Sequence, residues 1–434
     1  MSRTLLIIGA GVMQVPAIRI AREMGLQVAV TDYNAEAIGM RLADFPLVMS
    51  TRDVEGNVRI ARDFNRRHRI SGVITVGTDA SMTVAAVAQA LGLSGITFEA
   101  AEMATNKLKM RRRLRERGVP CPDFRAVWSL ADARNAFRTL GFPAVIKPCD
   151  NMGARGVLRV GGPDEIDAAF RHAKSCTPSG ELIVEQYMDG PELSIDALVV
   201  DGEPVLWGIA DRIIALPPHF IELGHTLPSA LPAEVQQAAC DVMRAGIAAL
   251  EITTGAAKGD IKVTTQGVMV GEIAARLSGG FMSSYTYPLA TGIDMIKGAI
   301  KLALGEDPRP FPAPAARVAL ERAIIPAHGH IISISGVAEA RRLPGVQEIF
   351  LSYQEGQTFP PPQSNLDKLG HVIAVGDTRA QAEAAAEAER QRIEQDRAAR
   401  AEADRKAEED RRAELERQER ETAAATSTLT FTKP

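Results

Sequence analysis

The chain has 434 residues, of which 46% are hydrophobic and 24% charged, with a net charge of −4 and a pI near 6.1. This length exceeds one compact core, so we expect two or three domains. The lack of a basic excess argues against a nucleic-acid partner, and no run approaches the roughly 18–20 apolar residues of a membrane span. The four cysteines form no CxxC pair, which fits a reducing compartment, so we expect a cytoplasmic protein.

The first hundred residues alternate predicted strands with predicted helices. Short apolar runs predict buried strands at residues 4–8, 28–30, 46–49 and 72–77. Helical patterns follow them, reaching Met24 in the first case and then covering residues 36–43, 54–68 and 80–91. Such alternation predicts right-handed βαβ units and a parallel, Rossmann-like sheet.

A dinucleotide site is one interpretation of this region. Gly9 and Gly11 open a helix, and Asp32 lies 21 residues after Gly11. The third glycine of that fingerprint is replaced by Gln14. We therefore favour a tight backbone turn and close helix packing as the reason for these glycines.

A basic helix and a glycine loop follow. Residues 106–122 predict a helix whose arginines mostly face solvent. Residues 142–148 predict a strand carrying Lys147, before a glycine-bearing loop at 150–156. A lysine beside such a loop suits a polyphosphate, although an ordinary hairpin explains the pattern equally well.

The next segment predicts three strands joined by turns at Asp189–Pro191 and Asp201–Gly202. Glu185 and Glu192 lie at strand ends, where a carboxylate can accept hydrogen bonds from an adenine amine or ribose hydroxyls. Solvent exposure is the alternative for both. Residues 210–232 predict a long, proline-rich specificity loop.

Residues 258–280 carry the strongest local signal. A hairpin turning near Gln266 places Asp260 opposite Glu272, with Cβ atoms about 4.5–5.5 Å apart. Two carboxylates this close repel each other unless a cation lies between them, and Mg²⁺ prefers such oxygens together with phosphates. Arg276 follows four residues later and can grip a carboxylate or phosphate. The pair His328 and His330 has no evident third ligand, and we interpret both as ordinary strand-end residues.

Taken together, these motifs resemble the ATP-grasp superfamily, in the branch of carboxylate–amine ligases similar to L-amino acid ligases. The resemblance covers residues 1 to about 376 and keeps the family's motif order. It implies ATP, Mg²⁺ (which Mn²⁺ could replace), small-molecule carboxylate and amine substrates, and an amide formed through an acyl phosphate. Many relatives are dimers, so the resemblance allows a homodimer.

The resemblance also implies roles for single residues. The nucleotide-binding positions map onto Lys107, Lys147, Gly153, Ala154, Glu185, Tyr187 and Glu192. The metal ligands map onto Asp260 and Glu272, and the catalytic arginines onto Arg276 and Arg212. The substrate-facing positions map onto Glu222, His225, Gly279 and Gly280.

Four positions depart from the family's pattern. Ala274 replaces a common asparagine ligand, Asp260 a common glutamate, and Ala154 a lid serine. Biotin carboxylases resemble this architecture but carry a glutamate base where this chain has Gly280, so we disfavour bicarbonate as the substrate.

The predicted fold class is multidomain, α/β and α+β. We expect a Rossmann-like domain over residues 1–98, small and large ATP-grasp subdomains over 99–180 and 181–310, and a β-rich C-terminal lobe over 311–377. Residues 378–434, rich in Ala, Glu and Arg, predict a solvated helix or a disordered extension.

Two alternatives to the amide ligase stay open. One is an ATP-grasp carboxylase or formate-using transferase of nucleotide metabolism. The other is a nucleotide-binding regulator without turnover, which Ala274 at the metal site would allow.

Overall fold

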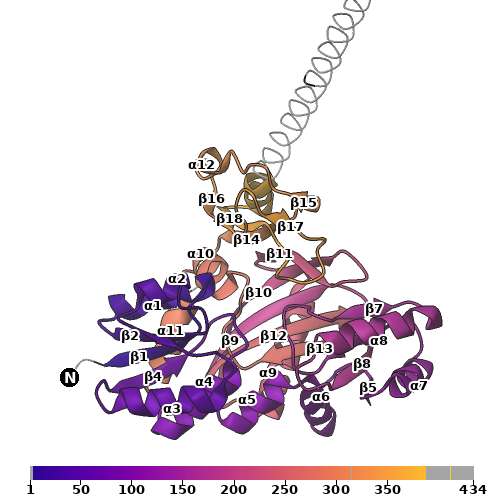
Figure 1. Cartoon of the computed structure of the whole chain (residues 1–434), viewed down its shortest axis with the longest axis horizontal. Coiled ribbons are helices and arrows are strands. Elements are labelled where there is room, and N and C mark those ends of the chain that lie inside the picture. The colour runs from indigo at the N-terminus through magenta and orange to yellow at the C-terminus, as the bar shows by residue number, and fades with distance from the viewer. Residues whose placement is uncertain (1–2, 314, 388–410, 412–434) are drawn as a thin grey trace, which may run out of the picture.

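The computed structural model describes residues 3–313, 315–387 and 411. Its described part is a mixed α/β fold with a four-stranded parallel sheet, a second four-stranded sheet, an eight-stranded sheet and a two-stranded ribbon. Figure 1 shows the parallel sheet and the second small sheet on either side of the long central sheet. None of the described helices is long and apolar enough to cross a membrane. The predicted tail begins too early: residues 379–387 are a helix that packs Ala382, Ala385 and Ala386 into the C-terminal lobe, and apart from residue 411 the rest of the tail lies outside the described residues.

The N-terminal sheet is parallel, as its alternating pattern predicts, and its strand order is β3-β2-β1-β4. Its strands are β1 (Thr4–Ile8), β2 (Gln27–Asp32), β3 (Phe45–Val48) and β4 (Ile70–Ile74). Its helices are α1 (Val15–Glu23), α2 (Ile38–Leu42), α3 (Val54–Asn65) and α4 (Ser81–Leu91). One face packs on α1 and α2, the other on α3 and α4. A short 3-10 turn, Val12–Gln14, precedes α1.

The glycine turn after β1 is occupied by the chain's own side chains. Asp32 accepts hydrogen bonds from the backbone N–H groups of Ala10 (2.9 Å) and Asn34 (3.0 Å). Gln14 donates to the carbonyl of Val76 and lies against Gly9. A tight, internally bonded turn therefore accounts for these residues.

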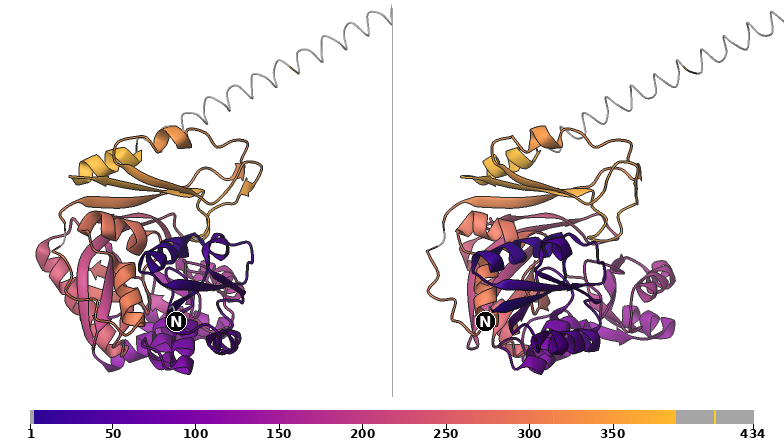
Figure 2. Two further views of the ribbon diagram at one scale, coloured as in Figure 1. Left: turned by 90° about the vertical axis from the view of Figure 1, so that its left-hand side faces the viewer. Right: turned by 60° about the vertical axis from the view of Figure 1, so that its left-hand side comes forward.

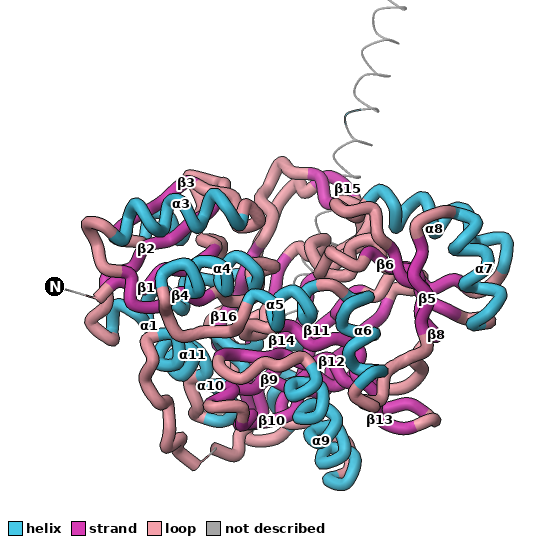
Figure 3. Tube along the Cα trace, turned by 90° about the horizontal axis from the view of Figure 1, so that it is seen from below, coloured by secondary structure: helices cyan, strands magenta, loops and turns pink. Residues whose placement is uncertain are grey.

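The second small sheet has the order β5-β8-β6-β7 and is antiparallel. Its strands are β5 (Phe124–Val127), β6 (Ala144–Pro148), β7 (Leu158–Val160) and β8 (Leu182–Gln186). Helices α7 (Leu130–Leu140) and α8 (Ile166–Ser175) pack against it around Phe137. Figure 3 shows this layer at the opposite end of the molecule from the parallel sheet.

The eight-stranded sheet runs in the order β13-β12-β9-β10-β11-β14-β18-β16. Its first five members are β13 (Gly267–Ala274), β12 (Gly255–Thr264), β9 (Glu192–Val200), β10 (Glu203–Ala215) and β11 (Ile221–Leu227). The C-terminal lobe adds β14 (Val318–Ile324), β18 (Gly370–Gly376) and β16 (Val346–Leu351). The lobe is therefore a continuation of the central sheet, and Figure 2 shows it covering one end of the molecule.

Smaller elements complete the C-terminal lobe. The ribbon pairs β15 (Gly329–His330) with β17 (Thr358–Phe359). Helix α12 (Val337–Ala340) lies between these two strands in the sequence.

The central sheet buries different chemistry on its two faces. On β9, the odd-numbered residues Leu193, Ile195, Ala197 and Val199 join an apolar cluster with helices α5 (Phe98–Thr105), α6 (Lys107–Glu116) and α9 (Ala233–Ala249). The even-numbered residues point to the other face, because strand side chains alternate. There Leu198 and Val200 are apolar, whereas Glu192, Ser194 and Asp196 make the rest of that face polar.

The segment at residues 210–232 differs from its prediction as a long loop. It contains the end of β10 and all of β11, which pair as an antiparallel hairpin with a register shift between Ile213 and Ile214. Only residues 216–220 form the turn, and Pro217 and Pro218 lie in it. The prolines were a correct turn signal, but the flanking residues gain ladder partners on both sides, β9 for β10 and β14 for β11.

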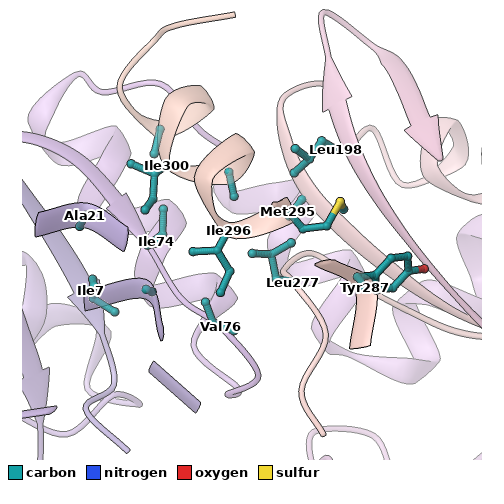
Figure 4. Packing of buried hydrophobic residues seen from close by; sticks show 14 of the residues in the cluster. Ile7, Ala21, Ile74, Val76, Leu198, Leu277, Tyr287, Met295, Ile296 and Ile300 are labelled. Atoms are coloured by element: carbon teal, nitrogen blue, oxygen red, sulfur yellow. The ribbon is translucent and has the colours of Figure 1, made fainter. Parts of the chain in front are cut away.

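The parallel sheet is tied to the central sheet by one shared apolar core. Helix α11 (Met295–Ala303), which follows the short π-helical turn Met282–Thr286 and α10 (Tyr287–Thr291), packs against β4 and α1. Figure 4 shows Ile296 and Ile300 of α11 between Ile74 on one side and Leu198 on the other. Burial of such side chains contributes roughly 1.5–3 kcal/mol each.

Two glycines bring the loops of these layers into backbone contact. Gly77 follows β4 with φ of +64°, and a Cβ there would lie 2.9 Å from the Cα of Gly279. Its N–H donates to the carbonyl of Leu277 at 3.2 Å, beside an isolated parallel bridge between Val76 and Leu277. Only glycine combines this backbone conformation with this approach.

We predict that Gly77→Ala lowers the free energy of unfolding by about 2–4 kcal/mol, from backbone strain of about 1 kcal/mol or more plus a forced separation of the two loops. Gly92→Ala is the matched control, since Gly92 has φ of +65° but open space around its Cβ position. Urea denaturation of both variants measures the difference. Equal losses of unfolding free energy in the two variants would show that the contact between the two loops does not contribute to stability.

Candidate active site

The described residues line a cleft of about 900 Å³ on the polar face of the central sheet, within the range typical of small-molecule sites. The loops after β1 and β4 form one wall, and the glycine loop after β6 covers the opposite side. The segments around Phe350 and His371 in the C-terminal lobe complete it. Of the fifteen residues to which the sequence analysis assigns nucleotide, metal, catalytic or substrate roles, all but His225 line this cleft.

The hairpin of β12 and β13 places Asp260 directly opposite Glu272, as the sequence predicts. The turn and the register that produce this pairing differ from the predicted ones. The turn contains only Thr265 and Gln266, since Thr264 already pairs with Gly267. A β-bulge after Asp260 then shifts the register by one residue. Gly271 lies in the bulge, where a Cβ would meet the Asp260 carbonyl oxygen at 2.8 Å.

Basic side chains already neutralise both carboxylates of this pair. Asp260 forms ion pairs with Arg212 (2.7 Å) and Lys258, and Glu272 lies 3.6 Å from the Lys107 ammonium. Burial alone would raise the pKa of Glu272, but Lys107 and the neighbouring cations lower it to about 2. The repulsion therefore does not by itself require a metal ion, contrary to the sequence argument.

The two candidate metal ligands stand without further protein ligands nearby. Within the described ranges, no group of three or more His, Cys, Asp and Glu side chains is placed to hold a metal ion. Ala274, on the same strand as Glu272, supplies no ligand atom. A Mg²⁺ ion here would thus take its remaining ligands from water or a bound phosphate, as this ion usually does.

The predicted phosphate lysines converge on the cleft from two different elements. Lys107 begins α6 and donates to the carbonyl of Asn151 in the glycine loop at 2.6 Å. Lys147 on β6 is buried and lies 2.6 Å from the carboxylate of Glu185 on β8. Burial lowers the pKa of Lys147, and the charge of Glu185 partly offsets that effect.

Glu185 has a partner that the sequence analysis missed. Arg111 on α6 donates to its two carboxylate oxygens at 2.8 and 3.3 Å, and both side chains are almost fully buried. Most arginines of this helix were expected to face solvent, but Arg111 is 1% exposed. The helical spacing offers the only local signal: Arg111 shares a face with the buried Lys107, Leu108 and Leu114.

Arg212 is the centre of a second charge network. Besides Asp260 it contacts Glu192 and, at 2.9 Å, Glu222. Burial would raise the pKa of Glu222, but Arg212 and the nearby Lys368 hold it well below its usual range. Glu192 and Glu222 thus line the cleft, and each is engaged by Arg212.

His225 lies below the cleft surface and is fully buried. Its Nε2 is 2.7 Å from the hydroxyl of Thr286, and its Nδ1 is 3.6 Å from Glu321 and 3.9 Å from Glu222. It is not among the residues that line the cleft, so direct substrate contact is not seen in this geometry. Burial lowers the pKa of His225 to about 4, which keeps the ring neutral.

The predicted lid is held against the rest of the cleft. Gly153 has φ of +67° and its carbonyl accepts a hydrogen bond of 2.9 Å from the N–H of Asn365. The Asn365 side chain in turn accepts from the N–H of Glu222 at 2.8 Å. Ala154 has φ of +60° in the same loop. Tyr187, beyond β8, contacts Arg159 and Phe220 at the cleft edge.

Three basic side chains face the cleft without an ion-pair partner among the described residues. Arg276 donates only to the carbonyl of Leu277 (3.0 Å) and Arg155 only to that of Met152 (2.9 Å). Lys368 is 4% exposed and makes no hydrogen bond or ion pair with the part of the chain that the structure describes. These three cations are the groups free to meet an anion.

The sequence analysis did not foresee the contributions of the outer walls. Arg52 and Asp79 from the parallel-sheet domain lie 3.7 Å apart at the cleft. Lys368 and His371 enter from the C-terminal lobe, where the sequence predicted only a closing strand. The sequence feature that could have indicated Lys368 and His371 is the Lys-Leu-Gly-His run at the start of an otherwise apolar strand.

Comparisons with known proteins agree with this geometry. Residues 140–285 match the model of an ATP-grasp domain, and residues 322–396 match that of the L-amino acid ligase C-terminal domain 2. The chain belongs to the ATP-grasp superfamily. Members of this superfamily that resemble it, including L-amino acid ligases, are ATP-dependent ligases, and this ATP-grasp chain is accordingly an enzyme of that class.

Three relatives illustrate the similarity. An L-arginine-specific L-amino acid ligase from Bacillus subtilis is 26% identical over 63% of this chain and 67% of its own length. The crystal structure of L-amino acid ligase from Bacillus licheniformis has a TM-score of 0.80 at 25% identity, covering 88% of this chain and 96% of that one. A carboxyaminoimidazole ribonucleotide synthase from Aspergillus clavatus, complexed with ATP, shares the fold with a TM-score of 0.73 at 18% identity, over 90% and 99% of the two chains.

We predict that Arg111→Leu lowers the free energy of unfolding by roughly 3–5 kcal/mol, because it leaves the buried Glu185 with Lys147 as its remaining close cation. Arg112→Leu, an exposed position on the same helix, should change it by less than about 0.5 kcal/mol. Chemical denaturation measures both. A small effect at Arg111 would mean that the ion pair is not needed to bury Glu185.

We also predict a loss of stability in mild acid that depends on His225. Because the folded pKa lies near 4 and the ordinary value near 6.5, the unfolded chain alone binds a proton between these pH values, so stability falls as pH drops through this window. At about 1.4 kcal/mol per pKa unit, the loss approaches roughly 3 kcal/mol. His225→Gln should lose correspondingly less between pH 7 and pH 4.5, whereas the exposed His330→Gln should match the unsubstituted protein. If the free energy of unfolding falls with pH equally in all three proteins, the prediction is wrong.

Proposed function

We propose that this protein joins a small-molecule carboxylate to an amine in an amide bond, through an acyl phosphate, with release of ADP and phosphate. The observation that carries the proposal is the charge arrangement of the cleft. Two opposed carboxylates, Asp260 and Glu272, face a cavity in which Arg155, Arg276 and Lys368 have no ion-pair partners within the described part of the chain. Such a site suits a Mg²⁺-bound polyphosphate beside a second anion.

The residues present fit both ATP and Mg²⁺. Asp260 and Glu272 would hold the ion through hard carboxylate oxygens, and Lys107 and Lys147, whose charges both act on Glu272, would share the phosphates. When bound, Mg²⁺ neutralises charge on the phosphate oxygens. The glycine loop offers backbone N–H groups at positions where φ is positive, namely Gly153 and Gly156.

In the first step the chain's task is positioning and charge compensation. Arg276 would orient the substrate carboxylate toward the γ-phosphorus, since its guanidinium faces the cleft without a carboxylate partner in the described structure. Lys107 and Lys147 would stabilise the charge that develops on the transferred phosphoryl group. Glu185 and Arg111 would hold Lys147 in place, because all three side chains are buried and in contact.

In the second step an amine attacks the acyl carbon and phosphate leaves. The lid would exclude water from the acyl phosphate, and Asn365 already links Gly153 of the lid to Glu222 of the sheet. Gly280 has φ of +60° and lines the cleft with open space around it, so its N–H is a candidate donor to the oxyanion. Gly279 has a structural role, because its Cα lies against Gly77.

The similarity to carboxyaminoimidazole ribonucleotide synthase does not support a carboxylase function for this chain. At 18% identity it reports the fold alone. The position of the biotin-carboxylase base is Gly280 in this chain, which cannot act as a base. Bicarbonate is nevertheless a necessary arm of the functional test.

The test is phosphate release from ATP and Mg²⁺ over pools of L-amino acids and small carboxylates, with and without amines, and with bicarbonate alone. We expect turnover that requires both a carboxylate and an amine. Lys147→Met should reduce the rate about 10- to 100-fold, as expected for loss of one charge-assisted contact worth roughly 1.5–3 kcal/mol. Glu272→Gln should reduce it further.

Lys297→Met is the matched control, because Lys297 is exposed on α11 away from the cleft. Circular dichroism verifies that each variant folds. Full activity in Lys147→Met would rule out its assigned role. Turnover with bicarbonate alone would favour the carboxylase, and ATP binding without turnover in any pool would favour the regulator.

A further inference from the structure

A row of polar side chains crosses the central sheet and enters the C-terminal lobe. His225 on β11 lies directly opposite Glu321 on β14, with Nδ1 3.6 Å from the carboxylate. Glu321 pairs with Ile373 on β18, so His371, two residues earlier, lies on the same face and diagonal to it. The His371 Nδ1 is 2.6 Å from the Glu321 carboxylate.

This contact fixes how His371 presents its ring. Glu321 is 1% exposed, and although burial would raise its pKa, the hydrogen bond and charge of His371, together with Lys368, hold it below the usual value. An ionised carboxylate accepts a hydrogen bond, so Nδ1 of His371 carries the proton. In the neutral ring the lone pair then lies on Nε2, which makes no hydrogen bond to any described residue.

The ring also borders the cleft. His371 is among the cleft-lining residues, its side chain is 11% exposed, and its ring packs edge-on against Phe281 with centroids 5.1 Å apart. Phe281 directly follows Gly280, the candidate oxyanion donor. Phe350, the cross-strand neighbour of His371 on β16, also stacks on Phe281, with the two ring centroids 4.1 Å apart. His371 therefore contacts Phe281, the residue next to the proposed oxyanion donor Gly280.

Amide formation needs such a group, and this inference rests on the proposed function. An amine is mostly protonated near neutral pH and must lose a proton to attack and form the amide. Each carboxylate that lines the cleft in the described structure is paired with a lysine or arginine and is a poor base; these are Asp79, Glu185, Glu192, Glu222, Asp260 and Glu272. Among the described lining residues, His371 alone is an imidazole, and its Nδ1 is hydrogen-bonded to a carboxylate.

We propose that His371, oriented by Glu321, is the general base of the acyl-transfer step. The ammonium first gives one proton to solvent, and the neutral amine nitrogen forms the N–C bond. Its second proton passes to Nε2 of His371, and the C–O bond to the phosphoryl group breaks as phosphate leaves with the electron pair. Glu321 acts as a positioning residue that keeps the proton on Nδ1 and stabilises the imidazolium. His371 then returns the proton to solvent or to the departing phosphate.

The test compares two acceptors in the same protein with ATP, Mg²⁺ and a pool of L-amino acids. Hydroxylamine is unprotonated at neutral pH and traps an acyl phosphate as a hydroxamate without needing a base. In His371→Gln we expect hydroxamate formation within about threefold of the unsubstituted protein, whereas amide formation falls roughly 10²- to 10⁴-fold. Glu321→Gln, which keeps the shape but removes the charge, should show a smaller loss of the same kind.

The exposed His330→Gln should leave both products unchanged. Equal losses of hydroxamate and amide in His371→Gln, or an unchanged rate of amide formation, would overturn the assignment. If His371→Gln does not fold, the same comparison in Glu321→Gln decides. Absence of both products in the unsubstituted protein would instead overturn the proposed function, and the base assignment with it.

Discussion

The register of the central sheet is the constraint on which the site depends. Lys262, Glu192, Arg212, His225 and Glu321 are cross-strand neighbours in turn, so one row of side chains crosses five strands. Opposite charges alternate through its first three members, and buried charges must be paired. A slip of one residue would send this row to the apolar face, so the charge pairs and the register specify each other.

Charge balance in the cleft separates groups that hold the site together from groups free to act. The lining carboxylates are all engaged by lysine or arginine, and Arg212 alone contacts three of them. By contrast, Arg155, Arg276 and Lys368 have no ion pair with the described residues. In a cavity that excludes water, unpaired positive charge attracts anions more strongly than it would at the surface. The cleft is therefore built to receive negative charge that the folded chain does not supply.

The cleft exists because separate layers approach one another closely. Gly77 and Gly279 allow the parallel-sheet domain to reach the segment after β13, and α11 seals that junction with apolar side chains. On the far side, Asn365 of the C-terminal lobe joins the glycine loop to β11. Sites between layers of this kind bury most of a ligand while drawing functional groups from several elements. The location of His371 beside Phe281 follows from the same arrangement.

The sequence by itself determined the order of elements, the parallel N-terminal sheet and the pairing of Asp260 with Glu272, because these depend on local periodicity and on strands adjacent along the chain. Even there the bulge at Gly271, not the simple turn, produces the observed register. Only the tertiary structure decided that Arg111 meets Glu185, 74 residues away, that the supposed loop at 210–232 is a strand pair, and that Lys368 and His371 face the cleft. These features arise where distant segments pair across a sheet or bury a charge together, and no local pattern encodes which partner a strand or a buried charge will find.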